Sequence, residues 1–305
     1  MAGRSRPQLC ATYGLALASH PGPTAAVTAI MTALAVTAGR GASTAWVALA
    51  VLAGQLSVGW SNDYLDRHRD RSAVRSAKPI AAGGLSPTLV GTAALVALAA
   101  AVAFSFASGW RAALAHIAGI AAAWAYNLGL KGTAASVLPY AVAFGLLPAF
   151  VTLGLEGHPW PAWWAMAAGG LLGTAAHFTN VLPDIPDDAD AGVRGLPHRL
   201  GATRSRLVSA GALLAASVLL IAAPAPADSP VRVGTAGILG LVAVAVAGIV
   251  MVALPLRNEP ATAGRPEQTG QTGQTGQTGR TVFVVTVLVA LADVALLVAR
   301  GASIH

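Results

Sequence analysis

Charged residues and cysteine are both scarce in this chain. Only 10% of its 305 residues are charged, whereas 55% are apolar, and a soluble domain usually carries roughly a quarter charged residues. So few charges cannot cover a globular surface in water, and lipid must therefore surround most of the chain. The single cysteine, Cys10, excludes an intramolecular disulfide and a metal site built from paired cysteines.

Apolar segments are abundant and long. One bilayer crossing takes about 20 residues, so the length fits one bundle rather than several soluble domains. We expect an all-α polytopic membrane protein with about nine transmembrane helices, in a single domain over residues 1–305. The expected cores of the spans are Thr24–Ala38, Ala45–Ser61, Thr88–Ala107, Arg111–Leu128, Ser136–Leu155, Pro161–Val181, Leu207–Ala223, Val233–Leu254 and Val282–Ala299.

The basic residues are distributed as the positive-inside rule requires. With the N-terminus in the cytoplasm, nine spans place 15 of the 19 Lys and Arg residues on the cytoplasmic side. The four others are Arg40, Arg111, Arg232 and Arg300. We therefore predict a multi-pass protein of the cell membrane, and we attribute the net charge of +7 to topology rather than to a nucleic-acid partner.

The segments outside the spans carry little chemistry. Residues 1–21 form an N-terminal segment without a cleaved signal peptide, either an interfacial helix around Leu9–Ala18 or a disordered tail. Residues 257–281 contain the Gln-Thr-Gly repeat Gln268–Gly279, which has no apolar residue. We interpret this segment as a flexible cytoplasmic linker.

Two acidic motifs follow the second and sixth spans. Both have the pattern Asn-x3-Asp-x3-Asp, and both are expected at the cytoplasmic surface. Their equivalent positions suggest an internal repeat of four helices. The residues are Asn62, Asp66 and Asp70 in the first motif and Asn180, Asp184 and Asp188 in the second, with Asp63 and Asp187 beside them.

Spacing of four places the side chains of each motif on one helical face. Like charges on one face repel each other, and a divalent cation removes the conflict. Oxygen ligands suit Mg²⁺, which commonly bridges carboxylates to substrate phosphates. The alternative, solvated loop acids, explains one such motif better than two matched ones.

The polar face of each motif extends into the membrane. Gln55 precedes Asn62 by seven residues, and His177 precedes Asn180 by three. Polar residues within spans usually face an interior, so we expect both to line a cavity below the metal site. Cations near the motifs fit a bound diphosphate, and we favour this role for Arg75, Lys78 and Lys131 over topology alone.

These residues resemble the UbiA superfamily of intramembrane prenyltransferases. Its first motif, Asn-Asp-x-x-Asp-x-x-x-Asp, is matched by residues 62–70, and its downstream loop by Lys78-Pro79 and Gly84-Leu85-Ser86. Its second motif, Asp-x-x-x-Asp, is matched by Asp184 and Asp188, and its Tyr and Lys after the fourth span by Tyr126 and Lys131.

The resemblance implies helices around a central cavity that opens to lipid. It implies that the motifs hold Mg²⁺ on the diphosphate of an isoprenoid donor, with Asp66 and Asp184 central to catalysis. Arg75, Lys78, Tyr126 and Lys131 would bind the diphosphate, and a lipophilic acceptor, aromatic or a quinone precursor, would attack the allylic cation. The oligomeric state does not follow from the sequence.

The sequence departs from the family pattern at two places. Pro183 and Pro186 flank Asp184, so the second helix ends early or is kinked, and Asp187 then competes with Asp188 as a ligand. The stretch Ser19-His20-Pro21 stands where relatives often carry an arginine, which argues against an aromatic acid as the acceptor. Cyclisation of the diphosphate alone is the second hypothesis, and a cation-coupled transporter ranks below it.

Overall fold

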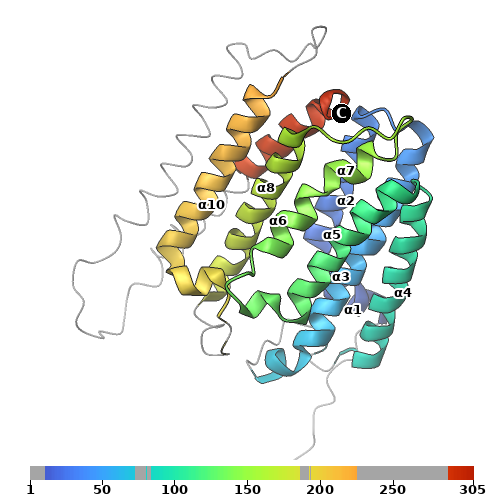
Figure 1. Ribbon diagram of the computed structural model, residues 1–305. Coiled ribbons are helices and arrows are strands. Elements are labelled where there is room, and N and C mark those ends of the chain that lie inside the picture. The colour runs from blue at the N-terminus through green and yellow to red at the C-terminus, as the bar shows by residue number, and fades with distance from the viewer. Residues whose placement is uncertain (1–10, 73–79, 81–83, 186–191, 193, 225–287) are drawn as a thin grey trace, which may run out of the picture.

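The computed structural model describes residues 11–72, 80, 84–185, 192, 194–224 and 288–305. Within these ranges the chain is helical and contains no strand (Figure 1). The helices are α1 (Ala11–Ala18), α2 (Pro21–Thr37), α3 (Thr44–Ser72), α4 (Pro87–Phe106), α5 (Trp110–Leu128), α6 (Leu138–Gly145), α7 (Leu147–Thr152), α8 (Trp163–Val181), α10 (Leu196–Ala222) and a helix over Leu288–Ala299. Short 3₁₀ turns are η1 (Gly41–Ser43), η2 (Leu130–Gly132), η3 (Leu182–Asp184) and η4 (Gly301–Ser303).

The expected class, an all-α polytopic membrane protein, is confirmed. Three helices are long and apolar enough to cross a bilayer, over Gly41–Asp70, Pro87–Phe106 and Leu196–Ala222. Shorter apolar helices occupy Pro21–Thr37, Leu138–Thr152 and Leu288–Ala299. The expected span over Val233–Leu254 and the Gln-Thr-Gly repeat lie outside the described residues, so the count of nine stays a prediction.

The outer faces of the bundle are apolar. Val36, Leu95, Val96 and Leu114 are large side chains that are more than half exposed. A surface of this kind is solvated by lipid rather than by water.

Tryptophans mark one end of the bundle. Trp46 and Trp110 lie near the starts of α3 and α5, and Trp160 and Trp163 lie at the start of α8, all exposed. These three helices begin at the same end of the bundle and run toward the acidic motifs (Figure 1). Exposed tryptophans gather at the membrane–water interface, so this end lies at the bilayer surface opposite the motifs.

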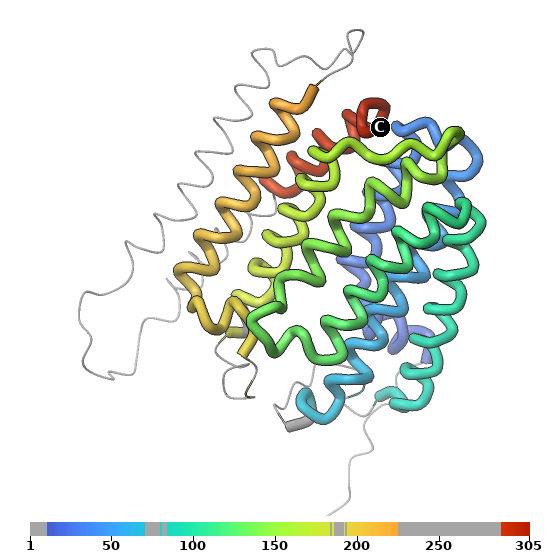
Figure 2. The backbone as a smooth tube through the Cα atoms, viewed as in Figure 1, coloured from blue at the N-terminus to red at the C-terminus, as the bar shows by residue number. Residues whose placement is uncertain are grey.

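One expected span is not a continuous helix. The segment predicted over Ser136–Leu155 is divided into α6 and α7, with Leu146 between them. Pro148 explains the break, because it lacks an N–H group and its ring collides with the carbonyl four residues earlier. In α10 a second irregularity occurs at Gly201, whose positive φ of 77° suits glycine. The tube in Figure 2 turns sharply before the long part of α10.

The last helix is fixed to α10 by polar contacts. Ser217 donates to Oδ1 of Asp293 at 2.5 Å, and Arg300 donates to the carbonyls of Ala223 and Ile221 at 2.9 and 3.2 Å. The arginine therefore satisfies backbone acceptors at the end of α10, where intrahelical partners are missing. Asp293 thus joins the last helix to α10.

Glycines allow α6 and α8 to approach closely. A Cβ atom on Gly173 would lie 2.4 Å from the carbonyl oxygen of Tyr140, and one on Gly169 would lie 2.6 Å from that of Phe144. The two glycines are four residues apart, as in close-packed transmembrane helices.

We predict opposite effects for two Gly→Ala substitutions. Gly173→Ala places a methyl group against backbone and should destabilise the protein by about 1–3 kcal/mol. Gly211→Ala in α10 is the matched control, because among the described residues no neighbouring atom lies within 4 Å of its added Cβ. It should be neutral or stabilising by up to about 1 kcal/mol. Thermal unfolding in detergent would measure both, and equal shifts would contradict the close approach.

Candidate functional site

The first acidic motif occupies the last turns of α3. Asn62, Asp66 and Asp70 share one face of this helix, and Asp63 is beside them. The three carboxylates are almost completely buried, with exposed fractions of 3% for Asp63, 6% for Asp66 and 1% for Asp70. Buried carboxylates are expensive unless cations or hydrogen-bond donors compensate them, so their partners define the site.

Asp66 is held between two cations. Lys131 of η2 pairs with its Oδ1 atom, and Arg69 donates to Oδ2 at 2.9 Å. Lys131, predicted to bind a diphosphate, thus lies beside the residue predicted to hold the metal. Arg67, two residues before Arg69, has other partners. It donates to the backbone carbonyl of Tyr64 at 2.7 Å, and its guanidinium group lies over the Tyr64 ring.

Asn62 is positioned by Asn127 of α5. Its Nδ2 atom donates to Oδ1 of Asn127 at 3.2 Å, which leaves the Asn62 carbonyl oxygen to accept a metal ion. Asn127 in turn donates to the carbonyl of Val58 at 3.0 Å and to Ser61 Oγ at 2.8 Å. Asn127 was not among the predicted site residues. The signal for it in the sequence was an amide side chain near the end of an otherwise apolar helix.

His20 lies in the stretch where relatives often carry an arginine. Its Nε2 atom lies 3.4 Å from Oδ1 of Asp63. The residue has a φ of 53° and precedes Pro21 at the start of α2. This contact brings the N-terminal segment to the first motif, with an imidazole in place of a permanent cation.

The end of α8 lies near the same end of the bundle as the first motif (Figure 1). His177 contacts Ser136 Oγ through Nε2 at 3.1 Å, and the same hydroxyl accepts from the backbone N–H of Leu196 at 2.9 Å. A Cβ on Gly195 would lie 2.5 Å from the carbonyl oxygen of Lys131. The segment between α5 and α6 therefore links the Asp66 region to α8 and α10.

Aromatic rings surround His177. Its ring centroid lies 5.7 Å from that of Tyr126, 5.1 Å from Tyr140 and 5.5 Å from Phe178. His177 itself precedes Asn180 of the second motif by three residues on α8. Tyr126, expected to contact a diphosphate, therefore belongs to an aromatic cluster next to the second motif.

The expectation of one helical face through the second motif is wrong for Asp184. α8 ends at Val181, and a 3₁₀ turn covers Leu182–Asp184. Pro183 and Pro186 explain this early end, because proline cannot donate to the helical ladder. For Asp184 only the backbone is described, and Arg75, Lys78, Asp187 and Asp188 lie outside the described residues. Within the described ranges, no three His, Cys, Asp or Glu side chains form a metal-binding group.

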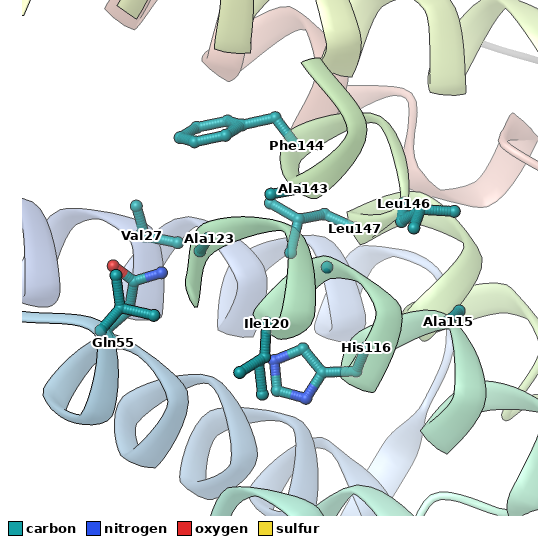
Figure 3. Close-up of a pocket in the computed structure, with 12 residues that line it drawn as sticks. Val27, Gln55, Ala115, His116, Ile120, Ala123, Ala143, Phe144, Leu146 and Leu147 are labelled. Carbon is teal, nitrogen blue, oxygen red and sulfur yellow. The ribbon is translucent and has the colours of Figure 1, made fainter. Parts of the chain in front are cut away.

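A pocket lies deeper in the bundle. It is lined by residues of α2, α3, α5, α6 and α7, among them Gln55, His116, Ile120 and Phe144 (Figure 3). Gln55, which was predicted to line a cavity below the metal site, is one of the lining residues. His177, with the same prediction, is not among them, whereas His116 is.

Comparison with known sequences gives a family match over most of the chain. The model of the UbiA prenyltransferase family matches residues 9–265. Among characterised proteins, a 1,4-dihydroxy-2-naphthoate octaprenyltransferase of Mycobacterium tuberculosis is 33% identical over 231 residues. The match covers 63% of this chain and 76% of that relative.

Solved structures of UbiA homologues have the same fold. A homologue from Archaeoglobus fulgidus bound to DMAPP and Mg²⁺ gives a TM-score of 0.63 at 14% identity, covering 92% of this chain and 99% of that one. The homologue bound to GPP and Mg²⁺ gives 0.61 at 15% identity over the same shares. An apo homologue from Aeropyrum pernix gives 0.60 at 17% identity, covering 94% and 98%. At these identities the likeness shows the fold alone.

Proposed function

Since the chain belongs to the UbiA prenyltransferase family, we propose that it transfers an isoprenyl group from a prenyl diphosphate to a lipophilic aromatic acceptor inside the membrane. The C1–O bond of the donor breaks, the diphosphate leaves with the electron pair, and an acceptor ring carbon bonds to C1 and loses its proton. The relative from Mycobacterium tuberculosis, named for prenyl transfer to a naphthoate, supports an aromatic acceptor. Membership of an enzyme family favours this function over a transporter.

One observation carries the proposal. Asp66, Lys131 and Arg69 form a charged group at the end of an apolar bundle, and apolar side chains fill the interior of the bundle beyond this group. A prenyl diphosphate has the same division, with a charged head and an apolar chain. The group of charges suits the head, and the bundle interior suits the chain.

The donor set of the first motif fits Mg²⁺. Carboxylate and amide oxygens are its preferred protein ligands, and Asn62 and Asp66 present both types on one helical face. We assign Asn62, Asp66, Asp70, Asp184 and Asp188 as its holders. The structures of homologues with Mg²⁺ and a prenyl diphosphate support this assignment. The bound ion would offset the negative charge of the leaving diphosphate.

Cations of the chain bind the diphosphate in this proposal. Lys131 has its ammonium group on Asp66 and is close to any phosphate held there, and Arg75 and Lys78 complete the set. The apolar bundle excludes water, which protects an allylic cation from hydrolysis. The excess of basic residues predicted at the motif end supports a cytoplasmic position for this end, and we keep the cell membrane as the proposed location.

Replacement of Asp66 should abolish turnover without unfolding the protein. Asp66→Asn keeps the size of the side chain and removes its charge, and we expect turnover at least about 100-fold lower. Purified protein would be incubated with an allylic diphosphate, a naphthol acceptor and Mg²⁺, and the diphosphate released would be measured. Arg67→Met is the matched control, because Arg67 contacts Tyr64 rather than the carboxylates; its activity should be unchanged.

Two outcomes would overturn the proposal. Full turnover by Asp66→Asn would show that the first motif is not the reaction centre. Prenyl products formed from the diphosphate alone, with no dependence on an acceptor, would establish cyclisation instead of transfer.

Asn127 should affect metal affinity through Asn62. Asn127→Leu removes the group that orients Asn62, and loss of such a partner typically weakens metal binding by about 10–100-fold. The measurement is the Mg²⁺ concentration that gives half-maximal activity. Trp124→Phe removes another hydrogen bond between α5 and α3, from Trp124 Nε1 to Ser57 Oγ at 3.1 Å, and should leave that concentration unchanged. Equal shifts in both variants would assign Asn127 to packing alone.

A further inference from the structure

The pocket has polar atoms that an isoprenoid chain does not need. Gln55 and His116 are its only lining residues with polar side chains, and the other ten are apolar or glycine. An isoprenoid chain has no hydrogen-bonding atom, so polar groups facing it would lose their water without compensation. Polar groups in an apolar pocket instead fix the orientation of a ligand that can hydrogen-bond with them.

Neighbouring residues determine which ring nitrogen of His116 carries the proton. Ser105 donates its hydroxyl proton to the carbonyl of Ala101 at 2.5 Å. The same Oγ atom lies 2.7 Å from Nδ1 of His116 and, having used its proton, accepts the Nδ1–H. The Nε2 atom of the neutral ring is therefore a hydrogen-bond acceptor.

The His116 ring is also fixed in orientation. It stacks on Phe150 with a centroid distance of 4.3 Å and an interplanar angle of 10°. A Cβ atom added to Gly54 of α3 would lie 3.5 Å from Nε2. Because residue 54 is glycine, no side chain at this position of α3 covers that nitrogen. No group in the described ranges bonds to Nε2.

We propose that this pocket binds the aromatic acceptor as a neutral ring with a hydroxyl group that donates to His116 Nε2. The inference rests on the proposed prenyl transfer and names the chemical class of its acceptor. No Lys, Arg, Asp or Glu lines the pocket, so a carboxylate on the acceptor would find no cation there. A carboxylate or ether oxygen would also meet the Nε2 lone pair without a proton between them.

The position of the pocket agrees with this role. His116 Nε2 lies at the level of Gly54 on α3, eight residues before Asn62, which is about 12 Å along the helix axis. An aromatic ring system bridges much of that distance, with one edge toward the diphosphate end and its hydroxyl toward His116. Figure 3 shows Phe144 of α6 across the pocket from His116 and Ile120, so apolar and aromatic side chains face the ring.

Two probes that differ by one proton donor test the proposal. Binding of 1-naphthol and of 1-methoxynaphthalene to the full-length protein would be measured by isothermal titration calorimetry in detergent, with protein-free micelles as the reference. Wild-type protein should bind the naphthol about tenfold more tightly, the worth of one hydrogen bond. In His116→Phe, which keeps a ring against Phe150, this preference should fall to about one.

Further variants separate positioning from folding. Ser105→Ala removes the group that fixes the His116 proton and should reduce the preference while the imidazole stays in place. Ile120→Leu changes an apolar residue of the same pocket and should keep the preference. Equal wild-type affinities for the two probes, no binding of either, or a preference that survives both His116→Phe and Ser105→Ala would overturn the inference.

The binding test needs neither donor nor metal, so the two proposals fail separately. A His116-dependent preference without any Mg²⁺-dependent transfer would remove the proposed function and keep the hydroxyl site. Transfer that depends on Asp66, with a naphthol preference untouched by the His116 and Ser105 variants, would remove the hydroxyl site alone.

Discussion

The burial of carboxylates at one end of an apolar bundle is the constraint on which the rest of this structure depends. Asp66 is almost sealed from solvent, and an ionised carboxylate in such a place needs compensating charge. Arg69, three residues away, supplies part of it. Lys131 supplies the rest from a distant part of the chain, so the α5–α6 connection has to return to the end of α3. This ion pair holds the α5–α6 connection against the end of α3.

The same connection organises the second half of the bundle. Ser136 accepts from the backbone of Leu196 and contacts His177, and Gly195 lies against the Lys131 carbonyl. The ends of α8 and α10 are thereby gathered around a segment that already contacts the first motif. Farther into the membrane, glycines on α8 allow a close approach to α6. Ion pairs and hydrogen bonds therefore join the helices at the motif end, whereas small residues allow α6 and α8 to pack closely in the interior.

The sequence was informative where a property depends on local spacing. Apolar segments predicted an all-helical membrane protein, and the four-residue spacing identified the face of α3 that carries Asn62 and Asp66. The roles of Asn127 and His116 were not predictable in this way, because they depend on which atoms of neighbouring helices meet these side chains. Pro148 did carry a local signal for the break between α6 and α7, but the apolar character of the whole segment concealed it. Proline also ended the second motif's helix before Asp184.

The two parts of the site are built on the same pair of helices. At the proposed metal end, α3 contributes Asn62 and α5 contributes Asn127. In the pocket, α3 contributes Gln55 and α5 contributes His116. Between these levels, α5 donates to Val58 and Ser57 of α3, so the helices cannot slide past each other without breaking those bonds. The separation of the two parts is therefore set by helix geometry rather than by loops. A reaction that joins two lipophilic molecules gains from such fixed spacing, because the entropy of bringing the reacting carbons together is lost on binding rather than at the transition state.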